Sequence, residues 1–317
     1  MSRKVLLPLL LSLTLCGCGG RKTGEVKVSR PFPSVQVPSL LTDPEEIMNY
    51  VLTRFWDPFL DSTKKYTTDS LTLLGVDRRE VGRQVATYAS LLENSPLPLA
   101  QKSIEVFFDK LEDWRSCRAD SLFEIMTKDV SECLYSVNSP LRNEDIYLPF
   151  AKRLASSPFT PEELKAGLEH DAAMCGLNQC GTPASDFRFK DSKGRIRTLY
   201  SVRADYTVLL FVNPGCHACG DAVAAFSSPR ISQAISSGTL AVLDVYIDED
   251  IEQWKKSSSE LPSGWISGYD PDGIIRRDVI YNVRAIPSAY LLDSEKRVIM
   301  KDAVEQNILD YLTNAIQ

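Results

Sequence analysis

Histidine is scarce in this sequence: His170 and His217 are the only two among 317 residues. A histidine-rich metal centre is therefore excluded, and no metal site is expected. Positive charge is not in excess either, because 36 Lys and Arg against 42 Asp and Glu give a formal net charge of −6. Nucleic acids and anionic lipids attract basic surfaces, so no nucleic-acid partner is expected. No glycine-rich phosphate loop is present, and we expect no cofactor.

After the N-terminus the sequence also lacks an apolar run long enough to span a bilayer. The N-terminal run, from Val5 to Leu15 behind Arg3 and Lys4, is too short for a permanent span and is typical of a signal peptide. It leads into Leu15-Cys16-Gly17-Cys18, which resembles the lipobox of bacterial lipoproteins. In that family a small residue precedes the lipid-bearing cysteine, so the resemblance implies a signal peptide over 1–17 and a lipid on Cys18. The alternative is an ordinary signal peptide, with Cys18 incidental.

Lipidation predicts a protein anchored in the cell envelope and facing the periplasm. Gly19 and the absence of an early acidic cluster favour the outer membrane over the inner membrane. Outside the cytoplasm the six remaining cysteines can form disulfides. We predict a structural disulfide between Cys175 and Cys180, with free thiols as the alternative, and a second pair between Cys117 and Cys133.

Two domains follow a short tether. Residues 18–42 contain Pro, Ser and Gly without any period, as expected of a linker. Residues 43–178 show helical periodicity, with start signals at Asp43-Pro44-Glu45-Glu46 and Thr160-Pro161-Glu162-Glu163. This pattern predicts an all-α domain of five or six helices.

Residues 181–317 have a different pattern. A hairpin is predicted around the turn at 191–194, and near-continuous apolar runs at 206–212 and 240–247 predict strands buried on both faces. Helical segments follow both runs, and a second hairpin at 288–301 precedes a closing helix. The predicted fold of this domain is α/β, a mixed sheet sandwiched by helices.

The residues that carry chemistry are Cys216-His217-Ala218-Cys219, at the point where a buried strand passes into a helix. The free amides of a helix N-terminus stabilise a thiolate there, and a protonated His217 adds to this effect. We therefore predict that Cys216 attacks a disulfide and that Cys219, one turn further on, resolves the product. The alternatives for such a motif are half of a zinc site or a structural disulfide.

A second element is Ile286-Pro287, whose proline lies 68 residues after Cys219. This dipeptide directly precedes an apolar strand. Thioredoxin-fold proteins keep a cis-proline facing their cysteine pair at this place, and we predict a cis bond here. The alternative is an ordinary trans proline that leads into a strand.

With both elements present, residues 181–317 resemble thioredoxin-fold reductases of the TlpA and ResA type. The whole mature chain is similar to a family of lipoproteins that join a helical domain of unknown function to such a domain. Segments 139–144, 216–219, 248–254 and 291–302 carry this second resemblance. It implies a thioredoxin fold after an all-α domain, and thiol–disulfide exchange on exported proteins or small disulfides. Reduction is the favoured direction, with a membrane thiol transporter as electron donor.

The sequence departs from the thioredoxin pattern at two positions. Gly215 stands where tryptophan usually precedes the first cysteine, and Leu210 stands where thioredoxin has a buried acid. Asp248, Glu249 and Asp250 are candidates to replace that acid, although a helix cap and solvated loop is the favoured interpretation. These departures support a rival hypothesis: a binding lipoprotein whose helical domain captures a partner and whose thioredoxin fold is a scaffold.

Overall fold

The computed structural model describes residues 30–64, 66, 68–118 and 121–316. The predicted signal peptide and Cys18 therefore lie outside the described residues. Over the described residues, the N-terminal half contains six α-helices, as the periodicity predicts, and a short hairpin that it does not predict. The elements are α1 (Pro44–Arg54), β1 (Thr72–Leu73), β2 (Val76–Asp77), α2 (Arg78–Glu93), α3 (Leu97–Cys117), α4 (Leu122–Tyr135), α5 (Glu144–Ser156) and α6 (Glu162–Cys175).

The helical half forms around a core of buried aromatic side chains. The start signal at Asp43 is used as predicted, because its carboxylate accepts a hydrogen bond from the Glu46 N–H at 2.9 Å and Pro44 occupies the first turn. Trp56, Tyr88 and Phe107 are at most 2% exposed and lie with ring centroids 5.4 to 6.0 Å apart. Such packing explains the aromatic stripes of this half without a cofactor.

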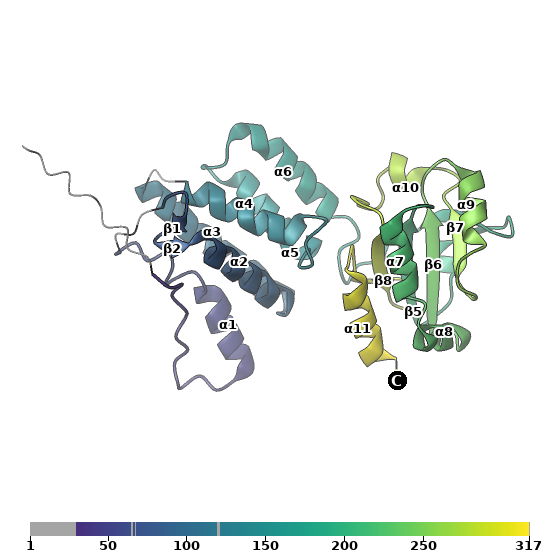
Figure 1. Ribbon diagram of the computed structural model, residues 1–317, viewed down its shortest axis with the longest axis horizontal. Helices are drawn as coiled ribbons and strands as arrows, with labels where there is room; N and C mark the ends of the chain where they lie inside the picture. The colour runs from purple at the N-terminus through teal and green to yellow at the C-terminus, as the bar shows by residue number, and fades with distance from the viewer. Residues whose placement is uncertain (1–29, 65, 67, 119–120, 317) are drawn as a thin grey trace, which may run out of the picture.

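The C-terminal half is a seven-stranded mixed sheet with helices on both faces, a thioredoxin-like fold (Figure 1). Its strands are β3 (Arg188–Asp191), β4 (Ile196–Thr198), β5 (Tyr206–Val212), β6 (Leu240–Tyr246), β7 (Ile266–Tyr269), β8 (Ser288–Leu292) and β9 (Val298–Met300). Its α-helices are α7 (His217–Ala225), α8 (Pro229–Ser236), α9 (Ile251–Ser258), α10 (Ile274–Arg277) and α11 (Glu305–Ala315). The strand order is β4-β3-β7-β6-β5-β8-β9, with β5 parallel to β6 and antiparallel to β8. The predicted fold class is confirmed, and β7 is the strand that the sequence analysis missed.

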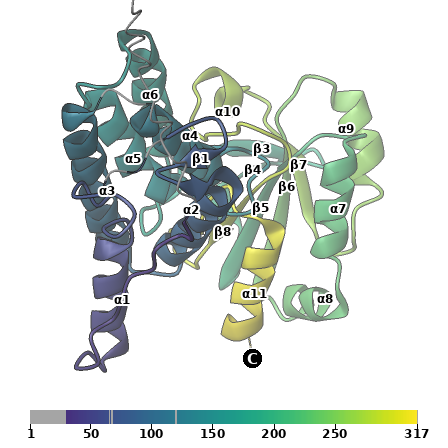
Figure 2. The ribbon, with the colours of Figure 1, turned by 60° about the vertical axis from the view of Figure 1, so that its left-hand side comes forward.

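Alternation along the central strands divides the core into two layers. Val208, Leu210 and Val212 of β5 face a cluster with Cys219 of α7 and Ile308 of α11. The intervening residues of β5 face the opposite layer. Figure 2 shows α7 and α11 at the sheet, with α1–α6 gathered beside it. Position 210 therefore lies on the same face of the sheet as the resolving cysteine.

Among the described residues, no helix combines the length and the apolar character needed to cross a membrane.

Candidate active site

Cys216 lies at the N-cap of α7, immediately after the turn that ends β5. Gly215 makes this turn with a φ of +78°, a conformation that glycine adopts without strain. This geometry accounts for glycine where thioredoxins usually have tryptophan. The Cys216 sulfur accepts a hydrogen bond from the Cys219 N–H at 3.3 Å, so the helix N-terminus points at this sulfur as the sequence predicts.

Cys219 lies one turn further along α7 and is 4% exposed, whereas Cys216 is half-buried. Both thiols are free in the structure. Burial raises the pKa of the Cys219 thiol. The half-buried sulfur is thus the one that a substrate disulfide can reach, and the buried one needs help to lose its proton.

Ile286 and Pro287 are joined by a cis peptide bond, as predicted, and both are half-buried. The Cys216 thiol donates a hydrogen bond to the Ile286 carbonyl oxygen at 3.7 Å. The structure therefore brings together Cys216, Cys219, Ile286 and Pro287 from two segments about 70 residues apart.

His217 does not join this group. Its side chain is 98% exposed, and its Nε2 lies 4.0 Å from Asp221 Oδ2 on the outer surface of α7. The structure therefore places the predicted supporting imidazole next to Cys216 in sequence but out in solvent.

A buried acid does lie beside the cysteine pair, but it is Asp244, in the middle of β6, and none of the three candidates at the end of that strand. It lies opposite Leu210 in the parallel β5–β6 register, so the acid stands one strand over from its position in thioredoxin. Asp244 is 3% exposed and lines a cavity of about 230 Å³ together with Cys216, Cys219 and Trp254. One signal in the sequence could have revealed it: a single acid inside a strand that is otherwise apolar on both faces.

Burial of Asp244 favours its neutral form and outweighs the hydrogen bond that its carboxyl group accepts. The Ser267 hydroxyl donates a hydrogen bond to Asp244 Oδ2 at 2.7 Å, and the Trp254 indole N–H donates to that hydroxyl at 3.1 Å. Among the described residues, none donates a hydrogen bond to the other oxygen, Oδ1. Burial therefore raises the pKa of Asp244 to about 7. A carboxyl group with this pKa can take up and release a proton near neutral pH.

The three acids considered in its place have structural contacts. Asp250 caps α9 by accepting a hydrogen bond from the Gln253 N–H at 3.0 Å, and Asp248 pairs with Arg276 and with the Asn213 amide. Glu249 is exposed. The favoured interpretation of a helix cap and solvated loop thus holds for Asp250 and Glu249, whereas Asp248 is partly buried and ion-paired.

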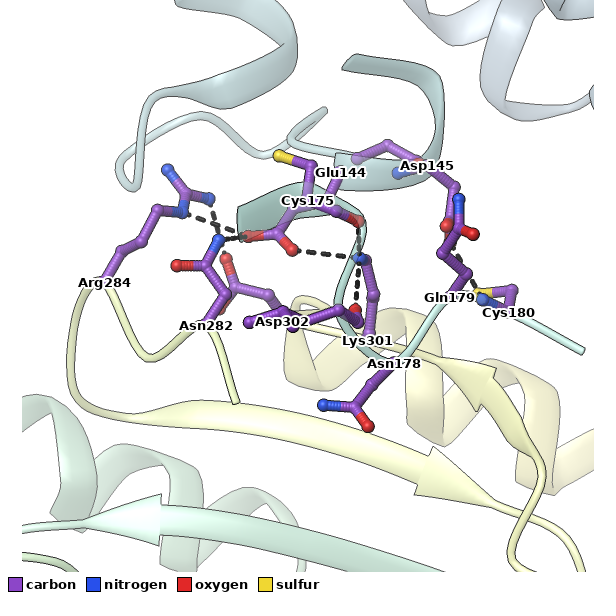
Figure 3. Close-up of polar contacts among 12 residues, drawn as sticks. Glu144, Asp145, Cys175, Asn178, Gln179, Cys180, Asn282, Arg284, Lys301 and Asp302 are labelled. Atoms are coloured by element: carbon purple, nitrogen blue, oxygen red, sulfur yellow. Dashed lines mark hydrogen bonds and ion pairs between the residues drawn. The ribbon is translucent and has the colours of Figure 1, made fainter. Parts of the chain in front are cut away.

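The predicted disulfides are absent from the structure, which has Cys117, Cys133, Cys175 and Cys180 as free thiols. The physical reason for Cys175 and Cys180 is that their side chains face different surroundings. Cys175 is fully buried in the core of the helical half. Cys180 is exposed, and its N–H points at Asp145 Oδ2, 3.4 Å away. Figure 3 shows the Cys175 sulfur above a polar cluster, and Cys180 to the right of this cluster beside Gln179.

That polar cluster joins the two halves of the chain. Glu144 Oε1 at the start of α5 accepts hydrogen bonds from Asn282 Nδ2 at 2.6 Å and Arg284 Nε at 3.1 Å, while Lys301 Nζ lies 3.2 Å from Oε2 (Figure 3). Arg284 also pairs with Asp302 at 2.9 Å. Segments 139–144 and 291–302, which carry the family resemblance, thus meet here. Among the described residues, no group of three or more His, Cys, Asp or Glu is arranged to hold a metal ion.

Comparison with known proteins agrees with this architecture. Residues 19–175 match the model of a domain of unknown function, DUF5106. A thioredoxin-like protein from Bacteroides caccae, known from its crystal structure, is 32% identical over 91% of this chain and 99% of its own, with a TM-score of 0.75. No functionally curated protein matches the chain.

Two shorter structures are also similar. The C-terminal domain of an uncharacterized protein from Bacteroides fragilis is 39% identical over 43% of this chain and 98% of its own, with a TM-score of 0.42. The thioredoxin domain of a thiol-disulfide oxidoreductase from Bacteroides vulgatus is 19% identical over 44% of this chain and 99% of its own, with a TM-score of 0.37.

Proposed function

The chain belongs to a family of thioredoxin-like proteins and carries a DUF5106 region at its N-terminus, and we propose that it is a thiol–disulfide oxidoreductase that reduces disulfides of exported proteins. The observation that carries this proposal is the Cys216 sulfur, held between the Cys219 N–H at 3.3 Å and the Ile286 carbonyl at 3.7 Å. A binding scaffold needs neither contact.

The reaction has two exchange steps. The Cys216 thiolate attacks one sulfur of the client disulfide, which forms a mixed disulfide and releases the other client sulfur as a thiolate. Cys219 then loses its proton and attacks the Cys216 sulfur, which forms the Cys216–Cys219 disulfide and releases the second client thiol. Two electrons pass from the chain to the client. A membrane thiol transporter would return the chain to its dithiol form.

Asp244 would serve as the proton acceptor for Cys219. It lines the same cavity as both cysteines and lies on the Cys219 face of the sheet. Burial raises the pKa of Asp244 to about 7, so near neutral pH its ionised form is available to accept a proton.

Turnover on a protein disulfide tests the proposal. The wild-type chain should reduce insulin with a dithiol as electron source, and Cys216→Ser should not. Cys219→Ser should accumulate reductant-sensitive adducts with client proteins, because the resolving thiol is gone. A binding lipoprotein would show no turnover and no adducts, and its partner capture would survive loss of both thiols.

Anchoring in the envelope is part of the proposal and rests on the signal-peptide pattern that ends at Gly17-Cys18. Cys18→Ser should yield an unlipidated form that leaves the membrane fraction without detergent. Equal retention of wild type and variant would contradict the anchor.

A further inference from the structure

A cleft of about 520 Å³ adjoins the redox site and lies between the two halves of the chain. Its near wall includes Ala218 and Asp221 of α7 and Pro287, and its far wall includes Val137 and Asn138 from the loop between α4 and α5. Resting on the function proposed above, we propose that this cleft binds an extended peptide segment of a client protein, with a basic side chain near the reacting cysteine. The helical half would then select clients.

The far wall is held in place by direct contacts to the cis-proline loop. Arg284, three residues before Pro287, donates a hydrogen bond to the carbonyl of Tyr135 and pairs with Glu144 at 3.1 Å. Arg142 donates to the Asp302 carbonyl at 3.1 Å. Loop 136–143 is thus fixed at both ends, and it lines the same cleft as the Ile286–Pro287 peptide bond. A binding surface made of two halves keeps its shape only if such contacts set their spacing.

The size and position of the cleft favour a peptide over a small disulfide. A small disulfide needs little more than the Cys216 sulfur, whereas a volume of about 520 Å³ holds several side chains. The cleft also runs along the backbone at Ala285–Pro287. An extended client chain lying there can form main-chain hydrogen bonds while its side chains fill the space toward α11 and the far wall.

Charge gives the specificity. Among the described residues that line this cleft, Arg142 is the one cation, and its side chain is 14% exposed and lies 3.6 Å from Asp302 Oδ2, a carboxylate that it shares with Arg284. The carboxylates of Asp221, whose side chain is 75% exposed, and of half-buried Glu305 also line it. A lysine or arginine beside the client cysteine would meet these carboxylates, and an acidic residue would be repelled.

The experiment compares three disulfide substrates on the full chain. Two are peptides of identical length with one disulfide, flanked by lysine in one and by glutamate in the other. The third is oxidised 2-mercaptoethanol, a small neutral disulfide. Wild type should show a KM about three- to tenfold lower for the lysine peptide than for the glutamate peptide, with similar kcat.

Asn138→Lys places a positive charge on the far wall, and Gln101→Lys on the exposed surface of α3 is the matched control. Asn138→Lys should remove most of the preference for the lysine peptide, whereas Gln101→Lys should change neither this preference nor the turnover of the small disulfide. Equal KM values for the two peptides in wild type, or identical behaviour of the two variants, would overturn the cleft proposal. If the wild-type chain turns over none of the three substrates, this result would instead contradict the oxidoreductase function itself.

Discussion

Glu144 of the helical half and Asp244 of the redox domain are both buried carboxyl groups, and their surroundings differ. Glu144, at the junction of the two halves, lies within 3.2 Å of both the Arg284 guanidinium and the Lys301 ammonium. Asp244, beside the cysteine pair, has one hydroxyl donor, Ser267, and lies in the apolar environment of a central strand. Burial raises the pKa of both carboxyl groups, but at Glu144 the charges of Lys301 and Arg284 oppose this effect, whereas at Asp244, among the described residues, only the Ser267 hydrogen bond does. We therefore assign Glu144 to architecture and Asp244 to chemistry.

The largest expected effect follows from breaking the paired site. Glu144→Ala leaves Lys301, whose side chain is 1% exposed, buried without this counter-charge. We expect a loss of about 3–5 kcal/mol in the free energy of unfolding, measured by urea denaturation. Glu132→Ala, which removes an exposed pair with Lys128, is the control and should cost less than ~1 kcal/mol. Equal losses in the free energy of unfolding for the two variants would contradict a structural role for the cluster around Glu144. If Glu144→Ala does not fold, Glu144→Gln, which keeps a hydrogen-bond acceptor, should show a smaller loss.

Substitution at Asp244 should raise the free energy of unfolding at alkaline pH instead of lowering it. Burial raises its pKa from 3.8 to about 7, so between about pH 4 and 7 the folded chain holds a proton that the unfolded chain has released. The stability that this proton provides is complete below pH 4 and is lost as the pH rises through 7. Asp244→Asn stays neutral and should be more stable than wild type at pH 8, by at most about 4 kcal/mol. Urea midpoints measured from pH 4 to 8 should fall more steeply for wild type, and parallel profiles would contradict the assignment.

The same variant should slow the chemistry that Asp244 serves. Without a proton acceptor, the Cys219 attack on a preformed mixed disulfide should slow by about 100-fold near neutral pH. A single-turnover measurement of client release would show this. Glu249→Gln is the control, because Glu249 is exposed and lies outside the cavity lining. An unchanged release rate in Asp244→Asn would leave Cys219 without an assigned proton acceptor.

The elements of the redox domain differ in whether a local sequence signal predicts them. Strand β5, over Tyr206–Val212, was predicted residue for residue because an apolar run bounded by turn residues is a strong local signal. The cysteine pair and the cis-proline were found because each carries its own motif. Strand β7 was missed because Ser267 and Gly268 interrupt its apolar pattern.

The surroundings of the two acids could not be derived in the same way. Leu210 and Asp244 face each other only through the β5–β6 register, and Glu144 meets Arg284 across 140 positions of sequence. Pairing at such distances depends on the assembled fold and not on local pattern. The lone acid inside a buried strand is nevertheless a local signal, because an acid is rarely buried without a reason, whereas acids at the end of a strand commonly cap helices.

The smallest expected effect sharpens the chemical side of the comparison. Ser267→Ala removes the hydroxyl that donates to Asp244 Oδ2 at 2.7 Å and leaves the carboxyl group in place. That hydrogen bond favours the ionised form and lowers the pKa of Asp244, although burial outweighs it. The variant should therefore shift the midpoint of the pH profile of client release upward by roughly one pH unit, because a hydrogen bond to a charged group contributes about 1.5 kcal/mol. The release rate well above the new midpoint should match wild type. Ser257→Ala is a suitable control, since Ser257 lines the same cavity but its hydroxyl donates to the Trp254 carbonyl at 3.1 Å. A midpoint that does not move in Ser267→Ala, or that moves equally in both variants, would show that the group titrating in this step is not Asp244.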